Sequence, residues 1–252
     1  MLRYIVAAGL LSLSACATQD VEQPRSVSTT AMPQVTIYHL EGRRSERIVW
    51  LMEELGQPYK LEYVRGDLRA SMAKVHALGH EMPQVPTVVI EDEILVESGA
   101  IIDTILNRYA PGQLAPAVDD PFYPKHQMWM HYAEGSLAAR LFSDYRAWRT
   151  NPPTQRSPLV DSEAVVQFAE NHLEKHPYFG GDVFSAADIM MHFPLRVALG
   201  LNLVDREQFP NIVAWNEKVE ARPAYRRMLA AARPDGMIGN LPPVEQRPPS
   251  DR

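Results

Sequence analysis

The segment Glu97-Ser98-Gly99-Ala100 combines a carboxylate, a hydroxyl and the start of a predicted helix. A helix N-terminus presents unpaired N–H groups and the positive end of the helix dipole, so it favours a bound carboxylate. The Ser98 hydroxyl can donate to that carboxylate, and Glu97 can pair with an ammonium group nearby. Together these groups would bind the amino-acid end of a small ligand, such as the γ-glutamyl end of glutathione. Alternatively, Ser98 is only the N-cap of its helix.

The residues around this segment predict a small α/β domain over residues 33–113. A β-branched and aromatic run at 35–39 indicates a first strand. Apolar residues recur at helical spacing over 45–55, and Gly56 ends that helix. The other predicted elements are a strand at 59–63, a helix at 68–78, strands at 87–90 and 94–96, and a helix at 98–109. The order β-α-β, a linking helix and then β-β-α is typical of a thioredoxin-like domain.

A proline lies directly before the third predicted strand, in Gln84-Val85-Pro86-Thr87. Proline is tolerated at the start of a strand because the sheet loses no needed donor there. In thioredoxin-like folds this X-Pro bond is cis, and it turns the carbonyl and N–H of the preceding residue toward a bound peptide. Cis bonds are a small fraction of X-Pro bonds, so this expectation depends on the resemblance, and a trans proline at a strand edge is the alternative.

The chain after a Pro- and Gly-containing linker at 110–121 predicts only helices. Ser185 and Asp188 have the spacing of a capping box at the start of one of them. The predicted helices cover 122–150, 159–175, 186–199, 211–221 and 224–232, and the Pro-rich tail from Pro234 is expected to be loosely ordered. The predicted fold class is therefore an α/β thioredoxin-like N-terminal domain followed by an all-α C-terminal domain at 119–240.

Several segments together resemble the glutathione transferase family. Residues 45–56 (SERIVWLMEELG) look like the family's first helix, and residues 95–101 (LVESGAI) look like its glutathione-binding segment. Residues 131–137 (HYAEGSL) and 186–195 (AADIMMHFPL) are similar to its helical domain. The resemblance covers about 200 residues and is nearest to a subgroup shared by bacteria and yeast. It implies glutathione transferase architecture, glutathione as co-substrate, a small apolar electrophile and a homodimer. The residues that it assigns to glutathione are Gln84, Val85, Pro86, Glu97 and Ser98.

Members of this family lower the pKa of the glutathione thiol with a group between the first strand and the first helix. A free thiol has a pKa of about 8.5, and each unit of lowering, about 1.4 kcal/mol, raises the thiolate fraction tenfold. Aligned on Arg47, the common serine position falls at Arg43 and the common cysteine position at Gly42. The usual hydroxyl or thiol is therefore missing from its expected place.

Three other groups are candidate catalytic residues. Ser45 is the only hydroxyl in the loop, and its alternative role is N-cap of the first helix. Arg43, or its neighbour Arg44, can stabilise a thiolate by charge because arginine stays protonated. Tyr38 lies at the end of the first predicted strand, where tyrosine-type members place their residue, although it is more typical of packing.

The composition argues against several other kinds of site. Hydrophobic residues make up 46% of the 252 residues, and the net charge of −6 shows no basic surface for nucleic acid. Cys16 is the single cysteine, which excludes a disulfide framework and a zinc site built on thiolates. His172 and His176 are spaced i, i+4 on a predicted helix, but no third ligand accompanies them. No metal is expected, and a solvated helix face is the favoured interpretation of that pair.

The first 32 residues predict an exported lipoprotein. Residues 4–13 are apolar but too short to span a bilayer as a permanent helix, and Leu13-Ser14-Ala15-Cys16 resembles a bacterial lipobox. The interpretation is a signal peptide at 1–16, a lipid anchor on Cys16 and a flexible tether at 17–32. Ala17 lacks the aspartate associated with inner-membrane retention, so the periplasmic side of the outer membrane is favoured. The alternatives are an ordinary secretory signal, or a cytoplasmic enzyme that starts at Met32.

The expected function is conjugation of the glutathione thiolate to an apolar electrophile, as in detoxification. Aromatic residues of the helix at 122–150, such as Phe142, are expected to pack in the core or to line the electrophile pocket. One alternative is a membrane-tethered glutathione-binding module with little turnover, which the missing hydroxyl at Arg43 favours. Glutathione-dependent peroxide reduction is another. Glutaredoxin-type exchange is disfavoured because the loop contains no cysteine.

Overall fold

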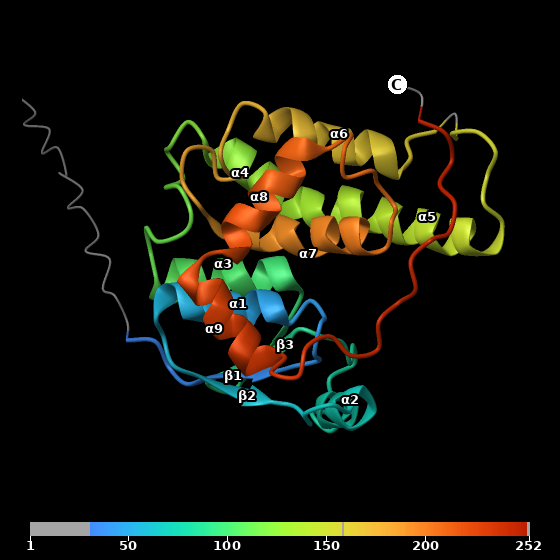
Figure 1. Ribbon diagram of the computed structural model, residues 1–252. Helices are drawn as coiled ribbons and strands as arrows, with labels where there is room; N and C mark the ends of the chain where they lie inside the picture. The colour runs from blue at the N-terminus through green and yellow to red at the C-terminus, as the bar shows by residue number, and fades with distance from the viewer. Residues whose placement is uncertain (1–30, 158, 251–252) are drawn as a thin grey trace, which may run out of the picture.

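The computed structural model describes residues 31–157 and 159–250 of the chain (Figure 1). The predicted signal peptide, the lipobox with Cys16 and most of the predicted tether lie outside the described residues. Within the described ranges, no helix is both long enough and apolar enough to cross a membrane.

The N-terminal domain is built on one four-stranded sheet in the order β2-β1-β3-β4. β1 pairs in parallel with β2 and antiparallel with β3, and β3 pairs antiparallel with β4. The strands are β1 (Val35–Tyr38), β2 (Tyr59–Glu62), β3 (Thr87–Ile90) and β4 (Glu93–Val96), and the helices are α1 (Glu46–Leu55), α2 (Leu68–His76) and α3 (Ser98–Tyr109). The predicted thioredoxin-like order is confirmed.

Helix α1 lies between the sheet and the helical domain. Its apolar residues Ile48, Leu51 and Met52 are fully buried, so the predicted stripe faces the core. Gly56 ends the helix in the left-handed conformation, with φ 62 and ψ 28, which a glycine adopts without steric cost. In Figure 1, α1 and α3 cover one face of the sheet, and α2 lies on the other side.

The C-terminal part is all helical, as predicted. The long stretch predicted at 122–150 is α4 (Tyr123–Tyr132), the π-helical segment η1 (Ala133–Ala138) and α5 (Ala139–Thr150) in direct succession. The later helices are α6 (Ser162–Leu173), α7 (Ala186–Gly200), α8 (Pro210–Glu220) and α9 (Pro223–Ala232). Helix α9 packs along α1 of the N-terminal domain (Figure 1), so the end of the chain contributes to both domains.

The predicted capping box at the start of α7 is present and extends further than expected. Ser185 Oγ accepts from the N–H of Ala187, and the Asp188 carboxylate accepts from the N–H of Ser185 at 2.9 Å. Asp188 is completely buried and also accepts from Phe179 N at 2.8 Å, Gly180 N at 3.3 Å and Trp215 Nε1 at 2.9 Å. One carboxylate therefore joins α7 to the preceding loop and to α8.

The interpretation of His172 and His176 as a solvated face was wrong. His172 is buried, and its ring stacks on His176 at 4.6 Å and on Phe179 at 5.6 Å between ring centroids. Its Nε2 atom lies 3.1 Å from the carbonyl oxygen of Tyr178. Helical spacing revealed that the two rings are neighbours, but it did not reveal that the segment after α6 folds over them.

The expectation of a loosely ordered tail was also wrong for the described residues. Val244 is 2% exposed, and its N–H donates to the carbonyl of Leu201 at 2.9 Å. The Tyr145 hydroxyl donates to the carbonyl of Pro242 at 2.9 Å. In Figure 1 the red tail runs from α9 along one side of the molecule toward the end of α5. The Pro-rich composition concealed these contacts, because they join the tail to residues far away in the sequence.

We expect Asp188→Ala to lower the free energy of unfolding by about 3 kcal/mol, because it leaves several buried N–H donors unpaired. The control is Asp67→Ala, which removes an exposed cap from the Ala70 N–H of α2 and should cost about 1 kcal/mol. Urea unfolding followed by circular dichroism compares the two variants. Equal losses would mean that the buried network contributes no more than an ordinary cap.

Candidate active site

Three loops meet at one end of the sheet. Because β1 pairs with β3 and β3 with β4, the loop after β1 leaves the sheet beside Val85-Pro86, and Glu97 follows β4 on the other side. Arg47 Nη1 lies 3.4 Å from Ser98 Oγ, which joins the first turn of α1 to the first turn of α3. The pairing of the strands thus gathers segments that are about 50 residues apart along the chain.

The residues predicted to hold glutathione lie together at this edge. The Val85-Pro86 bond is cis, as expected. Gln84 Nε2 donates to Glu97 Oε1 at 3.0 Å, and the carbonyl of Gln84 accepts from Thr87 Oγ1 at 2.5 Å. Glu97 has φ 71 and ψ 116, a conformation that is sterically costly for a residue with a Cβ. Such strain is concentrated at functional sites, which supports a binding role for this turn.

The sequence predicted no role for Arg47, which lies beside Ser98, or for its ion-pair partner Glu134. Arg47 is 2% exposed, and its Nη1 lies 2.5 Å from Glu134 Oε1. Burial lowers the pKa of Arg47 to about 10, so the guanidinium is still protonated at neutral pH. Glu134 lies in η1, and π-helical segments are frequent at functional sites. It also accepts two hydrogen bonds of 2.8 Å from Arg44. The segment HYAEGSL and the alignment anchor Arg47 were the signals that could have identified this pair.

Ser45 is fully buried within the loop between β1 and α1. Its Oγ lies 2.8 Å from His39 Nδ1 and accepts from the Leu40 N–H at 3.1 Å. His39 Nε2 is 2.6 Å from the carbonyl of Ala232. A carbonyl only accepts, so we assign the proton to Nε2 and let the Ser45 hydroxyl donate to Nδ1. Burial lowers the pKa of His39 to about 4, so the ring is a neutral acceptor at neutral pH.

These contacts argue against Ser45 or Tyr38 as the group that touches a bound thiol. The Ser45 hydroxyl has two acceptors within the loop, His39 Nδ1 at 2.8 Å and the Leu40 carbonyl at 3.3 Å. Although Ser45 stands at the N-cap position of α1, its side chain makes no capping bond. Tyr38 is the last residue of β1 and points to the face opposite the buried Ile37, because successive strand side chains alternate. All of these contacts of Ser45 lie within the loop between β1 and α1, which supports a structural role for its hydroxyl.

Arg43, the remaining candidate, lines a cavity of about 710 Å³. The cavity lies between this loop, α5, α7 and the tail, and its size suits a small organic ligand. Its apolar lining residues are Phe142, Phe193, Val197, Leu201, Met237, Leu241, Pro242 and Pro243. Of the aromatic residues predicted to pack in the core or to line a pocket, Phe142 lines this cavity, whereas the contribution of the tail was not foreseen.

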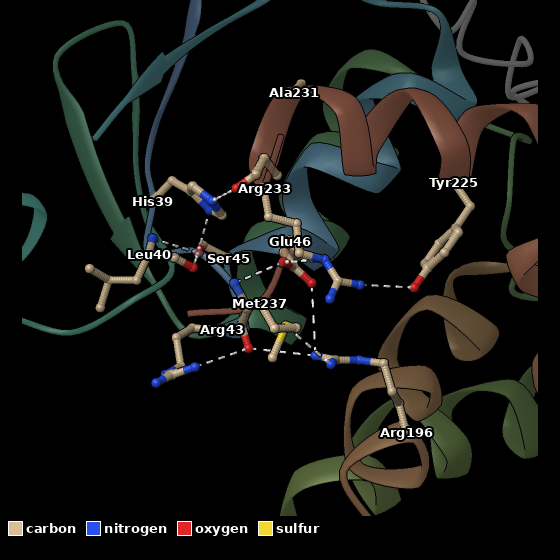
Figure 2. Close-up of polar contacts among 12 residues, drawn as sticks. His39, Leu40, Arg43, Ser45, Glu46, Arg196, Tyr225, Ala231, Arg233 and Met237 are labelled. Atoms are coloured by element: carbon tan, nitrogen blue, oxygen red, sulfur yellow. Dashed lines mark hydrogen bonds and ion pairs between the residues drawn. The ribbon is translucent and has the colours of Figure 1, made fainter. Parts of the chain in front are cut away.

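The carboxylate of Glu46 organises the loop beside this cavity (Figure 2). Its Oε1 accepts from the Gly42 N–H at 2.8 Å and lies 3.2 Å from Arg233 Nε, and its Oε2 lies 3.8 Å from Arg196. Gly42 has φ 72, and a Cβ there would lie 2.7 Å from Met237 Cε. The positive φ favours glycine at this position, and a side chain there would also require the flexible end of Met237 to move.

Among the described residues, no group of three or more His, Cys, Asp or Glu side chains could hold a metal ion. The described site therefore consists of guanidinium, carboxylate and hydroxyl groups, together with the start of α3 and an apolar cavity.

A thioredoxin-like domain with this strained turn beside a cis-proline, joined to an all-helical domain, is the architecture of the glutathione transferases. The chain belongs to the glutathione S-transferase family. The family's N-terminal domain model matches residues 37–113, and its C-terminal domain model matches residues 153–223.

Relatives of known name agree with this assignment. The chain is 30% identical over 214 residues to glutathione S-transferase 3 of Schizosaccharomyces pombe. The aligned region covers 76% of this chain and 85% of that protein. It is 23% identical to glutathione S-transferase 1 of Saccharomyces cerevisiae, over 81% of this chain and 97% of that one. The crystal structure of a glutathione S-transferase from Actinobacillus pleuropneumoniae superposes with a TM-score of 0.66 at 26% identity, over 79% of this chain and 92% of that one. Both domains are included in these similarities, so the chain is an enzyme of this family.

We expect Ser98→Ala to weaken glutathione binding about tenfold, since a hydrogen bond to a charged group is worth about 1.5–3 kcal/mol. Isothermal titration calorimetry with glutathione measures the change. Ser157→Ala, an exposed serine whose Oγ accepts from the Leu159 N–H, is the control and should bind as the wild type does. Unchanged affinity in Ser98→Ala would reduce Ser98 to the N-terminal residue of α3.

Proposed function

We propose that this protein conjugates the glutathione thiolate to an apolar electrophile, as a homodimer with a role in detoxification. The observation that carries the proposal is the cavity of about 710 Å³, which opens against Gly42 and Arg43 of the loop between β1 and α1. In this architecture that loop faces the glutathione thiol. An apolar cavity at the same loop would hold the second substrate within reach of the sulfur, which is how orientation accelerates a reaction of two molecules.

Glutathione would lie along the edge formed by Gln84, Val85-Pro86 and the start of α3. Its γ-glutamyl carboxylate would accept from the Ser98 hydroxyl and from the free N–H groups of the first turn, while Glu97 would pair with the ammonium group. The buried guanidinium of Arg47, 3.4 Å from Ser98 Oγ, adds positive charge behind the carboxylate. Gln84 supports this arrangement because it holds the Glu97 side chain at 3.0 Å.

Arg43 is the proposed group that stabilises the thiolate. None of the ion pairs among the described residues includes Arg43, and its guanidinium donates to the carbonyls of Gly42 and Gly239. Its charge is therefore available to an anion in the cavity. The thiol proton would leave to solvent, the sulfur would form a bond to the electrophilic carbon, and the leaving group would depart with the bonding electron pair.

We expect Arg43→Met to raise the pKa of the bound glutathione thiol by about one unit, with about a tenfold loss of turnover below that pKa. Arg43→Lys should keep part of the effect, because it keeps the charge. Ultraviolet absorbance of the thiolate, followed against pH, measures the pKa directly. Ser45→Ala is the matched variant and should change the thiol pKa little, although it loosens the loop.

A large rise of the thiol pKa in a folded Ser45→Ala protein would make Ser45 the activator after all. A bound thiol with the pKa of free glutathione in the wild type would instead favour a glutathione-binding module with little turnover, for which the buried Ser45 hydroxyl is the structural argument.

The lipobox sequence Leu13-Ser14-Ala15-Cys16 supports a second part of the proposal, a lipid anchor that holds the enzyme at the periplasmic side of the outer membrane. We expect Cys16→Ser to lose incorporation of labelled fatty acid and to leave the membrane fraction, whereas Ser26→Ala in the tether should behave as the wild type does. Cell fractionation with an antibody against the protein measures this. A cytoplasmic protein that begins at Met32 would contradict the anchor.

A further inference from the structure

The guanidinium of Arg196 has few good partners although it is largely buried. Its side chain is 17% exposed, and it lines the cavity from α7. Its polar contacts are long: 3.5 Å to the Gly42 carbonyl, 3.7 Å to Met237 Sδ and 3.8 Å to Glu46 Oε2. Its Nε is buried without a hydrogen-bond partner among the described residues. Since a guanidinium has five N–H donors with an optimum near 2.9 Å, this group is poorly satisfied.

The charges around Arg196 do not balance. Arg233 and Arg196 share the single carboxylate of Glu46, at 3.2 Å and 3.8 Å (Figure 2), and Arg43 of the same loop has no carboxylate partner of its own among the described residues. Burial, together with the neighbouring Arg196, lowers the pKa of Arg43, which is the sign expected for two cations close together. Burial raises the pKa of Glu46, which weakens its ability to neutralise them. Arg44 differs, because Glu134 accepts both of its hydrogen bonds.

The cavity wall around these cations is apolar. Phe142 and Phe193 lie on one side and Leu241 of the tail on another. None of the described residues that line the cavity is Asp or Glu. A neutral apolar ligand would displace water from the Arg196 guanidinium and offer no hydrogen-bond acceptor in its place, which is unfavourable. A ligand with an apolar body and an anionic head would satisfy both kinds of surface.

We propose that the electrophile is an apolar monocarboxylic acid, with its carboxylate bound by Arg196 and its body held between Phe142, Phe193 and Leu241. If Arg43 serves the thiolate, the guanidinium of Arg196 is still without a close acceptor, so it is available to an anionic group of the second substrate. Because guanidinium is planar and donates in parallel pairs, a carboxylate is the anion that it binds best in this apolar setting. This assignment rests on the proposed transferase function, since it names that enzyme's second substrate.

The first test measures binding without turnover. Decanoate and decanol, which share the apolar chain and differ in the head group, are titrated into the full chain saturated with glutathione. We expect decanoate to bind at least about tenfold more tightly than decanol, as charge-assisted hydrogen bonds predict. Arg196→Met should remove this difference and Arg196→Lys should retain part of it. Arg206→Met, at an exposed arginine outside the cavity, should behave as the wild type does.

Equal binding of decanoate and decanol by the wild type would overturn the proposal, even if no Arg196 variant folds. So would a preference for decanoate that survives in a folded Arg196→Met protein.

The second test separates this proposal from the transferase function. A long-chain ω-bromo acid and its methyl ester are compared as electrophiles, in which the thiolate displaces bromide at a carbon remote from the head group, and Arg196→Met should lower kcat/KM for the acid about tenfold more than for the ester. If the wild type conjugates neither compound but still prefers decanoate, the transferase proposal fails and the anion site stands. If Arg196→Met raises the pKa of the bound thiol as much as Arg43→Met does, Arg196 serves the thiolate, and the carboxylate assignment is overturned.

Discussion

Buried polar groups fix the loop between β1 and α1. Their partners lie within the loop itself and in the helical part of the chain. Glu46 accepts from the Gly42 N–H and contacts Arg196 of α7 and Arg233 after α9, while His39 joins Ser45 to the carbonyl of Ala232. Unpaired polar groups are costly in such a place, so each partner constrains the others. The loop that faces the glutathione thiol in this family thus has a shape set by the helical part of the chain.

A second set of contacts couples the glutathione edge to the helical domain. Arg47 links Ser98 at the start of α3 to Glu134, and Glu134 stands in the π-helical segment η1. A π-helical segment changes the direction of the side chains that follow it. The side chains of α5, after η1, therefore point in other directions than a continuous α-helix from α4 would give them. In this protein η1 supplies a carboxylate to Arg44 and Arg47, and Phe142, further along in α5, lines the cavity.

The C-terminal tail completes the cavity, so under the proposed function it would help to decide which electrophile binds there. Met237 packs against Gly42, Arg43 donates to the carbonyl of Gly239, and Leu241 forms part of the wall. Farther along, Val244 is buried against the helical domain and anchors the segment.

The sequence by itself determined the order of the elements, the ends of α1 and the capping box of α7, because these depend on local periodicity and on residues a few positions apart. It also identified the edge around Pro86 and Ser98. Two short strands joined by a tight turn pair with each other, so the residue before the first strand lies beside the residue after the second. Only the tertiary structure decided the direction of the Ser45 hydroxyl, the burial of His172, the packing of the tail and the poorly satisfied charge of Arg196. Each of these depends on partners from other segments, in most cases far along the chain, and local sequence patterns carry no information about such partners.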